Sequence, residues 1–284
     1  MTLSAAAAVR HHYDVGNDFY RLWLDPGLTY SCALPAGPDD GLAAAQARKV
    51  AHHLDAVGPC RHLLDVGCGW GGVLDAALER GTRTAVGLTL AEEQAAHVRA
   101  TARPGVEVRV ENWTDHEPDA PYDGIVSVGA LEHFARPEDD DERRVGRYRD
   151  FLTRCRDWLV PGGVLSLQTI AYGSMDRSEA SAFIQQDIFP AADLPSLVDL
   201  ARAADGLMEV RTLRDDRPHY AWTCERWLAN LRAHRDEAVA LVGEEVTARY
   251  ERYLLQSALG FRMGRIGLLR MVLAPRQRAW GALR

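Results

Sequence analysis

The sequence HLLDVGCGWGG, residues 62–72, carries the strongest fold signal in this chain. Apolar residues lead into Asp65, and an amphipathic stretch begins at Val73. Between them, glycines stand at every second position: Gly67, Gly69 and Gly71. This order predicts a strand, a tight turn and a helix, because glycine tolerates positive φ and lets the backbone approach a ligand closely. The spacing differs from the G-x-G-x-x-G of dinucleotide folds, and Thr89 stands where those folds place an acid. The turn therefore favours a bound nucleoside over a pyrophosphate.

Strand and helix patterns alternate along the chain on both sides of this turn. Strands are predicted at residues 62–66, 83–88, 106–111, 122–128, 163–170, 207–213 and 266–273. Helices are predicted at residues 42–57, 72–80, 91–102, 143–159, 194–204 and over much of 219–257. We therefore expect an α/β fold with a doubly wound, parallel, seven-stranded, Rossmann-like sheet. Such sheets bind ligands at the carboxyl ends of their strands.

We predict one domain, because a chain of 284 residues can bury one large core. Four regions are expected within it. They are a helical N-terminal cap at 1–58, a nucleoside-binding core at 59–170, a covering segment with helices at 171–262, and a last strand with a tail at 263–284.

Composition and charge argue against several kinds of partner and site. The net charge of −7 argues against a nucleic-acid partner. We expect at most peripheral contact with a membrane. No segment approaches 18 apolar residues, so we expect no transmembrane helix, and the first residues lead us to expect no signal peptide. The five cysteines form no C-x-x-C pair, so we expect neither a metal site nor a disulfide, and a cytoplasmic location. The single lysine, Lys49, is interpreted as codon usage in an arginine-rich chain.

Polar and aromatic residues follow the predicted strands where a nucleoside would lie. Thr89 and Gln94 can bond ribose hydroxyls; alternatively, Thr89 starts a helix and Gln94 faces solvent. Trp113, after Asn112, can stack on an adenine, or it can fill the core.

A second group of residues has the chemistry for catalysis. Glu132 and His133 follow a strand, where a carboxylate can stabilise a developing positive charge or accept a proton; a surface loop is the alternative. An aromatic cluster before the core can bind a cation or line an apolar pocket, or can simply pack as core. Its members are Tyr13, Phe19, Tyr20 and Tyr30.

Several segments together resemble the cyclopropane fatty acid synthase family of class I S-adenosylmethionine (AdoMet) methyltransferases. The mycolic acid cyclopropane synthases are the members most similar in length. The segments keep the family's order along the chain: residues 12–20, 28–33, 64–72, 87–90, 127–134, 187–190 and 219–223. The resemblance implies AdoMet as cofactor and methyl transfer as the reaction.

The resemblance also assigns roles to individual residues. It implies cofactor contacts at Tyr30, Ser31, Asp65, Gly67, Gly69, Thr89, Leu90, Gln94, Asn112, Trp113 and Gly129. It implies substrate contacts at Tyr13, Phe19, Tyr20 and Phe189. Catalytic roles fall on Cys32, Glu132, His133, Gln168 and Tyr220, four of which (all but His133) match the family's ligands for a bicarbonate base. Gln168 replaces the family's histidine. Because glutamine carries neither charge nor a mobile proton, it weakens the implied bicarbonate site.

We therefore expect a C-methyltransferase that acts on an alkene carbon through a carbocation, with a cyclopropane as one outcome. The acceptor is an unsaturated acyl chain, an isoprenoid or a specialised metabolite, either free or bound to a carrier protein. Two alternatives stay open: methylation of a small amine, and an AdoMet-fold cyclase without net methyl transfer. The sequence does not identify the acceptor.

Overall fold

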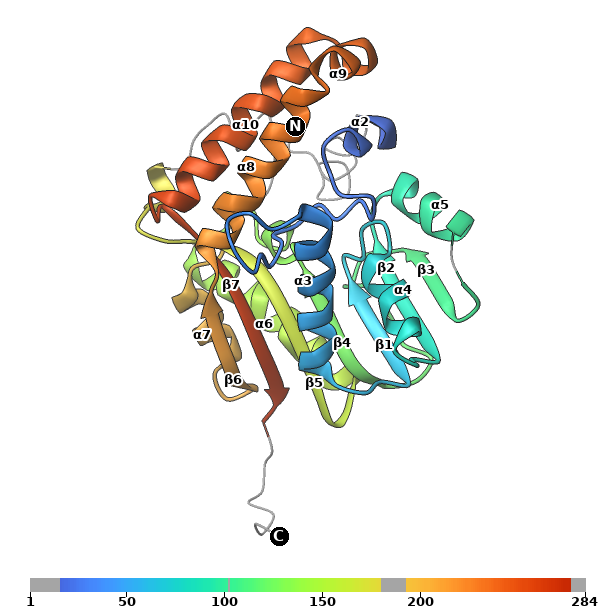
Figure 1. Cartoon of the computed structure of the whole chain (residues 1–284). Helices are drawn as coiled ribbons and strands as arrows, with labels where there is room; N and C mark the ends of the chain where they lie inside the picture. Colours follow the sequence, from blue (N-terminus) through green and yellow to red (C-terminus); the bar gives the residue numbers. More distant parts are fainter. Residues whose placement is uncertain (1–15, 102, 180–192, 277–284) are drawn as a thin grey trace.

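A seven-stranded sheet forms the centre of this computed structural model, which describes residues 16–101, 103–179 and 193–276 (Figure 1). The strand order is β3-β2-β1-β4-β5-β7-β6. The strands are β1 His62–Val66, β2 Thr84–Thr89, β3 Val106–Val110, β4 Tyr122–Val128, β5 Leu159–Tyr172, β6 Met208–Asp215 and β7 Ile266–Pro275. All seven coincide with predicted strands to within a few residues.

The prediction of an entirely parallel sheet is wrong at β7. Strands β1 to β5 pair in parallel, whereas β7 runs antiparallel to both β5 and β6. Ile266, the first residue of β7, pairs with Tyr172, the last residue of β5. The chain therefore enters β7 at the carboxyl edge of β5, directly after a covering helix, and needs no crossover. The alternation of apolar residues predicts a strand, but not whether that strand runs parallel or antiparallel to its neighbours.

Helices flank both faces of the sheet. The leucines of the central strand β1 are therefore buried on both sides. Leu63 packs with Val50 and Val73, whereas the next residue, Leu64, packs in a separate cluster with Phe151. Both faces of β1 are thus buried, as in a parallel sheet with helices on both sides. The flanking helices are α3 Leu42–Val57, α4 Gly72–Glu79, α5 Glu92–Thr101, α6 Asp141–Trp158 and α7 Leu197–Ala204.

A second group of helices lies over one end of the sheet (Figure 1). It consists of α2 Asn17–Arg21, α8 Arg217–Ala233, α9 Arg235–Val242 and α10 Glu244–Arg262. Aromatic residues of α2, of the turn that follows it, of α8 and of α10 share one core: Phe19, Tyr20, Trp23, Tyr220, Trp227, Tyr250, Tyr253 and Phe261. Two 3₁₀ turns, Leu131–His133 and Arg177–Glu179, lie in the connections. The described helices include none that is long and apolar enough to cross a membrane.

Helix α7 is tied to α6 by a buried ion pair. Arg144 Nε donates to Asp199 Oδ2 at 3.2 Å, and both side chains are more than nine-tenths buried. Asp199 also completes a capping box with Ser196 at the start of α7. One carboxylate therefore both caps a helix and compensates a buried guanidinium.

We expect Asp199→Ala to lower the free energy of unfolding by about 3 kcal/mol, because it removes the capping box and leaves the buried Arg144 with only the exposed Asp141 as an ionic partner among the described residues. Urea unfolding of the wild type and the variant measures the change. Glu142→Ala is the matched control, since it breaks the exposed pair with Arg202 between the same two helices and should cost less than about 1 kcal/mol. Equal losses in the two variants would contradict this account of the pair.

Candidate active site

The glycine turn after β1 brings two walls of a cavity together. Gly67 has a φ of 85°, and a Cβ atom added there would lie 2.6 Å from Ala130 Cβ. The backbone N–H groups of Gly67 and Cys68 both donate to Leu88 O at 2.9 Å. The turn is thus folded over the end of β2 and against the segment after β4, with no room for a side chain.

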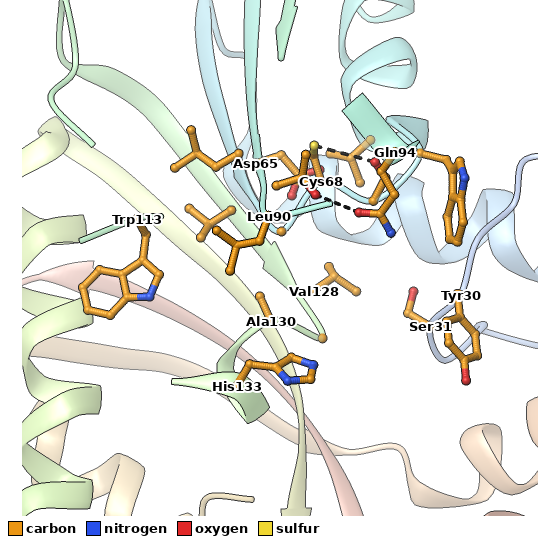
Figure 2. Close-up of a pocket in the computed structure, with 18 of the residues that line it drawn as sticks. Tyr30, Ser31, Asp65, Cys68, Leu90, Gln94, Trp113, Val128, Ala130 and His133 are labelled. Atoms are coloured by element: carbon orange, nitrogen blue, oxygen red, sulfur yellow. Dashed lines mark hydrogen bonds between the residues drawn. The ribbon is translucent and has the colours of Figure 1, made fainter. Parts of the chain in front are cut away.

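A cavity of about 460 Å³ lies at this turn and is called here the cofactor cavity. Figure 2 shows Tyr30 and Ser31 approaching it from one side and Trp113 from the other. The structure brings all eleven predicted cofactor residues into its lining: Tyr30, Ser31, Asp65, Gly67, Gly69, Thr89, Leu90, Gln94, Asn112, Trp113 and Gly129. Their convergence agrees with the expectation that ligands bind at the carboxyl ends of the strands.

Thr89 and Gln94 interact with each other inside the cofactor cavity. Thr89 Oγ1 donates to Gln94 Oε1 at 2.8 Å and accepts from Ala91 N at 3.1 Å. The threonine hydroxyl therefore orients the glutamine and closes the turn between β2 and α5. It does not start the helix, because Thr89 is the last residue of β2 and α5 begins at Glu92. Gln94 is buried, not solvated, and its amide nitrogen is the group that remains for a ribose hydroxyl.

Two buried ionisable groups, Asp65 and Lys49, belong to this lining. Asp65 is 2% exposed, its Oδ1 has no hydrogen-bond partner among the described residues, and burial raises its pKa to about 7. Lys49, also 2% exposed, donates to Ser31 Oγ at 2.9 Å, and burial lowers its pKa to about 8. The sequence analysis missed Lys49. Its being the chain's single lysine was the available signal, and it was attributed to composition.

A second cavity of about 400 Å³, called here the apolar cavity, adjoins the first. Its lining is mostly apolar and aromatic, and it includes Ile170, Tyr172, Leu194, Tyr220, Cys224, Tyr253, Phe261 and Leu268. Glu132 and Gln168 are its most deeply buried polar members. Four residues line both cavities: Tyr30, Ser31, Gly129 and His133. A group held in the cofactor cavity meets a molecule in the apolar cavity at these four residues.

Glu132 places a carboxylate at this junction. Its Oε1 accepts from Ile170 N at 2.6 Å, and its Oε2 has no hydrogen-bond partner among the described residues. Burial raises the pKa of Glu132 to about 7, against the backbone hydrogen bond that lowers it. Burial lowers the pKa of His133 to about 4, so this imidazole is neutral near pH 7. The pair can therefore exchange or accept protons without a permanent charge from the histidine.

Two further predicted catalytic residues line the apolar cavity. Gln168 is 1% exposed and receives hydrogen bonds on Oε1. Tyr220 is stacked on Phe261, with ring centroids 4.4 Å apart and an interplanar angle of 23°. Burial raises the pKa of Tyr220 well above its usual range, so its hydroxyl stays protonated and donates hydrogen bonds.

Three of the predicted site residues line neither cavity. The Cys32 side chain lines neither cavity, its Sγ lies 3.1 Å from Ala33 O, and burial raises its pKa to about 12, so the thiol is inert. Phe19 and Tyr20 are also outside both linings and pack in the helical core, because their helix turns its aromatic face toward α10. Tyr13 and Phe189 lie outside the described residues.

Comparison with known proteins decides the family. A family model described as mycolic acid cyclopropane synthetase matches residues 2–271. The chain belongs to this family. Cyclopropane mycolic acid synthase 1 of Mycobacterium tuberculosis is 37% identical over 281 residues, covering 92% of this chain and 94% of that protein. Cyclopropane mycolic acid synthase MmaA2 of the same species is 36% identical over 288 residues, covering 94% and 96%.

Solved structures agree with the family assignment. A crystal structure of the mycolic acid cyclopropane synthase CmaA1 complexed with SAH and CTAB has a TM-score of 0.85 at 34% identity, covering 97% of this chain and 99% of that one. This chain is an AdoMet-dependent methyltransferase, and AdoMet is its cofactor. The cofactor cavity fits the group, because it combines a glycine turn in which a Cβ at Gly67 would overlap Ala130 with the unpartnered oxygen of Asp65.

The raised pKa of Glu132 predicts a pH-dependent contribution to stability. The pKa rises from 4.5 in the unfolded chain to about 7 in the fold, so the folded state binds the proton more tightly. This contribution is fully present below about pH 4.5 and is lost as the pH rises through about 7. Relative to Glu132→Gln, the wild type should lose about 3 kcal/mol of unfolding free energy between about pH 4 and about pH 8. Urea unfolding of both proteins across this range tests it, and parallel pH profiles would contradict it.

Proposed function

We propose that this enzyme methylates an alkene carbon in an unsaturated acyl chain. One observation carries the proposal: an apolar, aromatic cavity meets the cofactor cavity beside a single buried carboxylate whose second oxygen is unpartnered. Such a lining suits an uncharged hydrocarbon and excludes water from the junction. AdoMet, when bound, supplies an electrophilic methyl group.

Aromatic residues would hold the positive charge that develops on the acceptor carbon. Attack by the π electrons of the alkene on a methyl group leaves a carbocation on the neighbouring carbon. Tyr220 and Tyr253 contribute aromatic rings to the same cavity, with Phe261 stacked on Tyr220. Aromatic faces attract cations, most strongly where water is excluded. The cavity therefore stabilises the charged species more than the neutral alkene.

Glu132 would direct the proton that must leave. Loss of a proton from the new methyl group closes a cyclopropane, and loss from the chain leaves a methylated alkene. Glu132 Oε2 can accept this proton or hold a small base beside the carbocation. A bicarbonate ion fits the residues present. Glu132 Oε2 would accept its O–H, and the Gln168 amide and Tyr220 hydroxyl would donate to its oxygens. Gln168 stands where the family has a histidine. Its amide can still donate a hydrogen bond, but it cannot carry a positive charge.

Transfer of labelled methyl groups tests the proposal. The enzyme is incubated with methyl-labelled AdoMet and four unsaturated acceptors: a free fatty acid, an acyl-carrier-protein thioester, a phospholipid and an isoprenoid. We expect label in an acyl acceptor. A ring and a methylated alkene have the same mass, so NMR separates them. Label in a panel of small amines and in no alkene would overturn the proposal.

We expect Glu132→Gln to lower kcat by about 10²-fold or more, because it removes the carboxylate that faces the developing charge. The affinity for AdoMet, measured by calorimetry, should change little, since Glu132 lines only the apolar cavity. Glu179→Gln is the matched control, because Glu179 lines the same cavity but is half exposed and lies near Arg265. A collapse of AdoMet binding in Glu132→Gln would show that Glu132 supports the cofactor instead.

A further inference from the structure

Arg270 is 2% exposed and contacts Gln168, a residue of the apolar cavity's lining. It stands on β7 directly opposite Gln168 of β5 in the antiparallel register, so both side chains emerge on the same face of the sheet. Nothing in the predicted motifs pointed to it. An arginine in the middle of the apolar strand Ile266–Leu273 was the available signal.

The guanidinium of Arg270 connects three separate parts of the site. Its Nε donates to Gln168 Oε1 at 2.8 Å. One terminal nitrogen donates to Asp216, which directly precedes α8 and therefore Tyr220. The other donates to Ala33 O at 3.1 Å, in the loop that carries Tyr30 and Ser31. All three nitrogens of this rigid fork are in use.

The hydrogen bond from Arg270 Nε to Gln168 Oε1 gives the Gln168 side chain a defined orientation. A guanidinium has donors only, so the oxygen of the Gln168 amide must face Arg270. His53 Nε2 approaches the same oxygen at 3.4 Å. Both side-chain hydrogen bonds of Gln168 to described residues thus use Oε1, which leaves the amide nitrogen for the apolar cavity that Gln168 lines. Beside Glu132, the cavity therefore receives a hydrogen-bond donor and not a second acceptor.

We infer that Arg270 is a positioning residue for methyl transfer: it fixes Gln168 as a donor toward the junction and holds the Tyr30–Ser31 loop and the start of α8 in register with it. The inference rests on the proposed function for its activity readouts. It specifies the ligand chemistry of the junction, because a donor from Gln168 next to the Glu132 carboxylate favours a small oxyanion or a carbonyl oxygen over an amine.

Gln168→Glu tests the orientation directly. The carboxylate keeps the side-chain length and can pair with Arg270, but it offers no donor to the cavity. We expect an unfolding midpoint no lower than that of the wild type, an unchanged affinity for AdoMet, and a kcat lower by about 10-fold or more. Gln168→His, which can accept from Arg270 and donate to the cavity, should retain activity.

A double-mutant cycle separates positioning from support of the fold. Arg270→Lys keeps the charge but cannot span Gln168, Asp216 and Ala33 together, so kcat should fall by about 10²-fold. In a Gln168→Met background the same change should still lower kcat, since the contacts to Asp216 and Ala33 are also lost, but by less than in the wild type, because the oriented group is already gone. Losses that multiply in full would overturn the inference that Arg270 orients Gln168. Arg211→Lys, an exposed arginine on β6, is the control.

An NMR measurement makes the inference independent of methyl transfer. The side-chain amide signal of Gln168 is assigned by its absence in Gln168→Glu. We expect a sharp, well-resolved pair in the wild type and a shifted or broadened pair in Arg270→Lys, because the amide oxygen loses its charged donor. An unchanged pair would overturn the positioning role. A wild type that methylates no alkene while the pair responds as expected would instead overturn only the proposed function.

Discussion

The absence of space beside Gly67 is the constraint on which the site depends. The end of β1 and the segment after β4 meet there so closely that a Cβ atom would overlap Ala130. This contact places the glycine turn, which forms one wall of the cofactor cavity, next to the turn that carries Glu132 and His133. Cofactor and carboxylate are thereby held at a fixed separation by backbone, which is stiffer than any side-chain contact.

Buried charge is the second organising feature, and it is distributed unevenly. Arg270 and Asp216 neutralise one another next to Gln168, and Lys49 partly offsets Asp65 in the wall of the cofactor cavity. Glu132 has no cationic partner in direct contact among the described residues. Burial therefore raises the pKa of its carboxyl, and no charged neighbour opposes that shift. A carboxyl that is close to half protonated near neutral pH is suited to take up a proton and release it again.

Local pattern was enough to predict most of the fold. Apolar runs located the central strands, because those strands are buried on both faces, and alternation of apolar with charged residues located the edge strand β3. The glycine spacing located the cofactor cavity, because only glycine fits a turn with positive φ and no free volume. The direction of β7 was not predictable, since a strand has the same side-chain period in either direction. Phe19 and Tyr20 were misplaced for a similar reason: an aromatic helix face looks alike in sequence whether it covers a pocket or packs as core.

The residues that sequence reasoning missed act over long distances along the chain. Arg270 meets Gln168 across 102 positions, and its role depends on a strand register that no short motif encodes. Lys49 likewise reaches Ser31 from helix α3, which packs on the sheet. In the sequence, this single lysine was attributed to codon usage. Motifs identify residues that touch ligands, because spacing within a turn fixes their geometry. Groups that orient those residues become visible only when distant elements are placed side by side.

The position of β7 has a consequence for how the enzyme acquires its site. Strand β7 follows every other strand in the sequence but lies between β5 and β6 in the sheet. Strands β1 to β5 can pair as the chain emerges, whereas β6 has no neighbour until β7 arrives. The strands that carry the cofactor cavity thus pair with strands nearby in the sequence. The contact that orients Gln168 requires the pairing of β5 with β7, which are far apart in the sequence. A folding intermediate that contains β1–β5 alone has the glycine turn but lacks the guanidinium that contacts Gln168, so completion of the catalytic geometry coincides with completion of the fold.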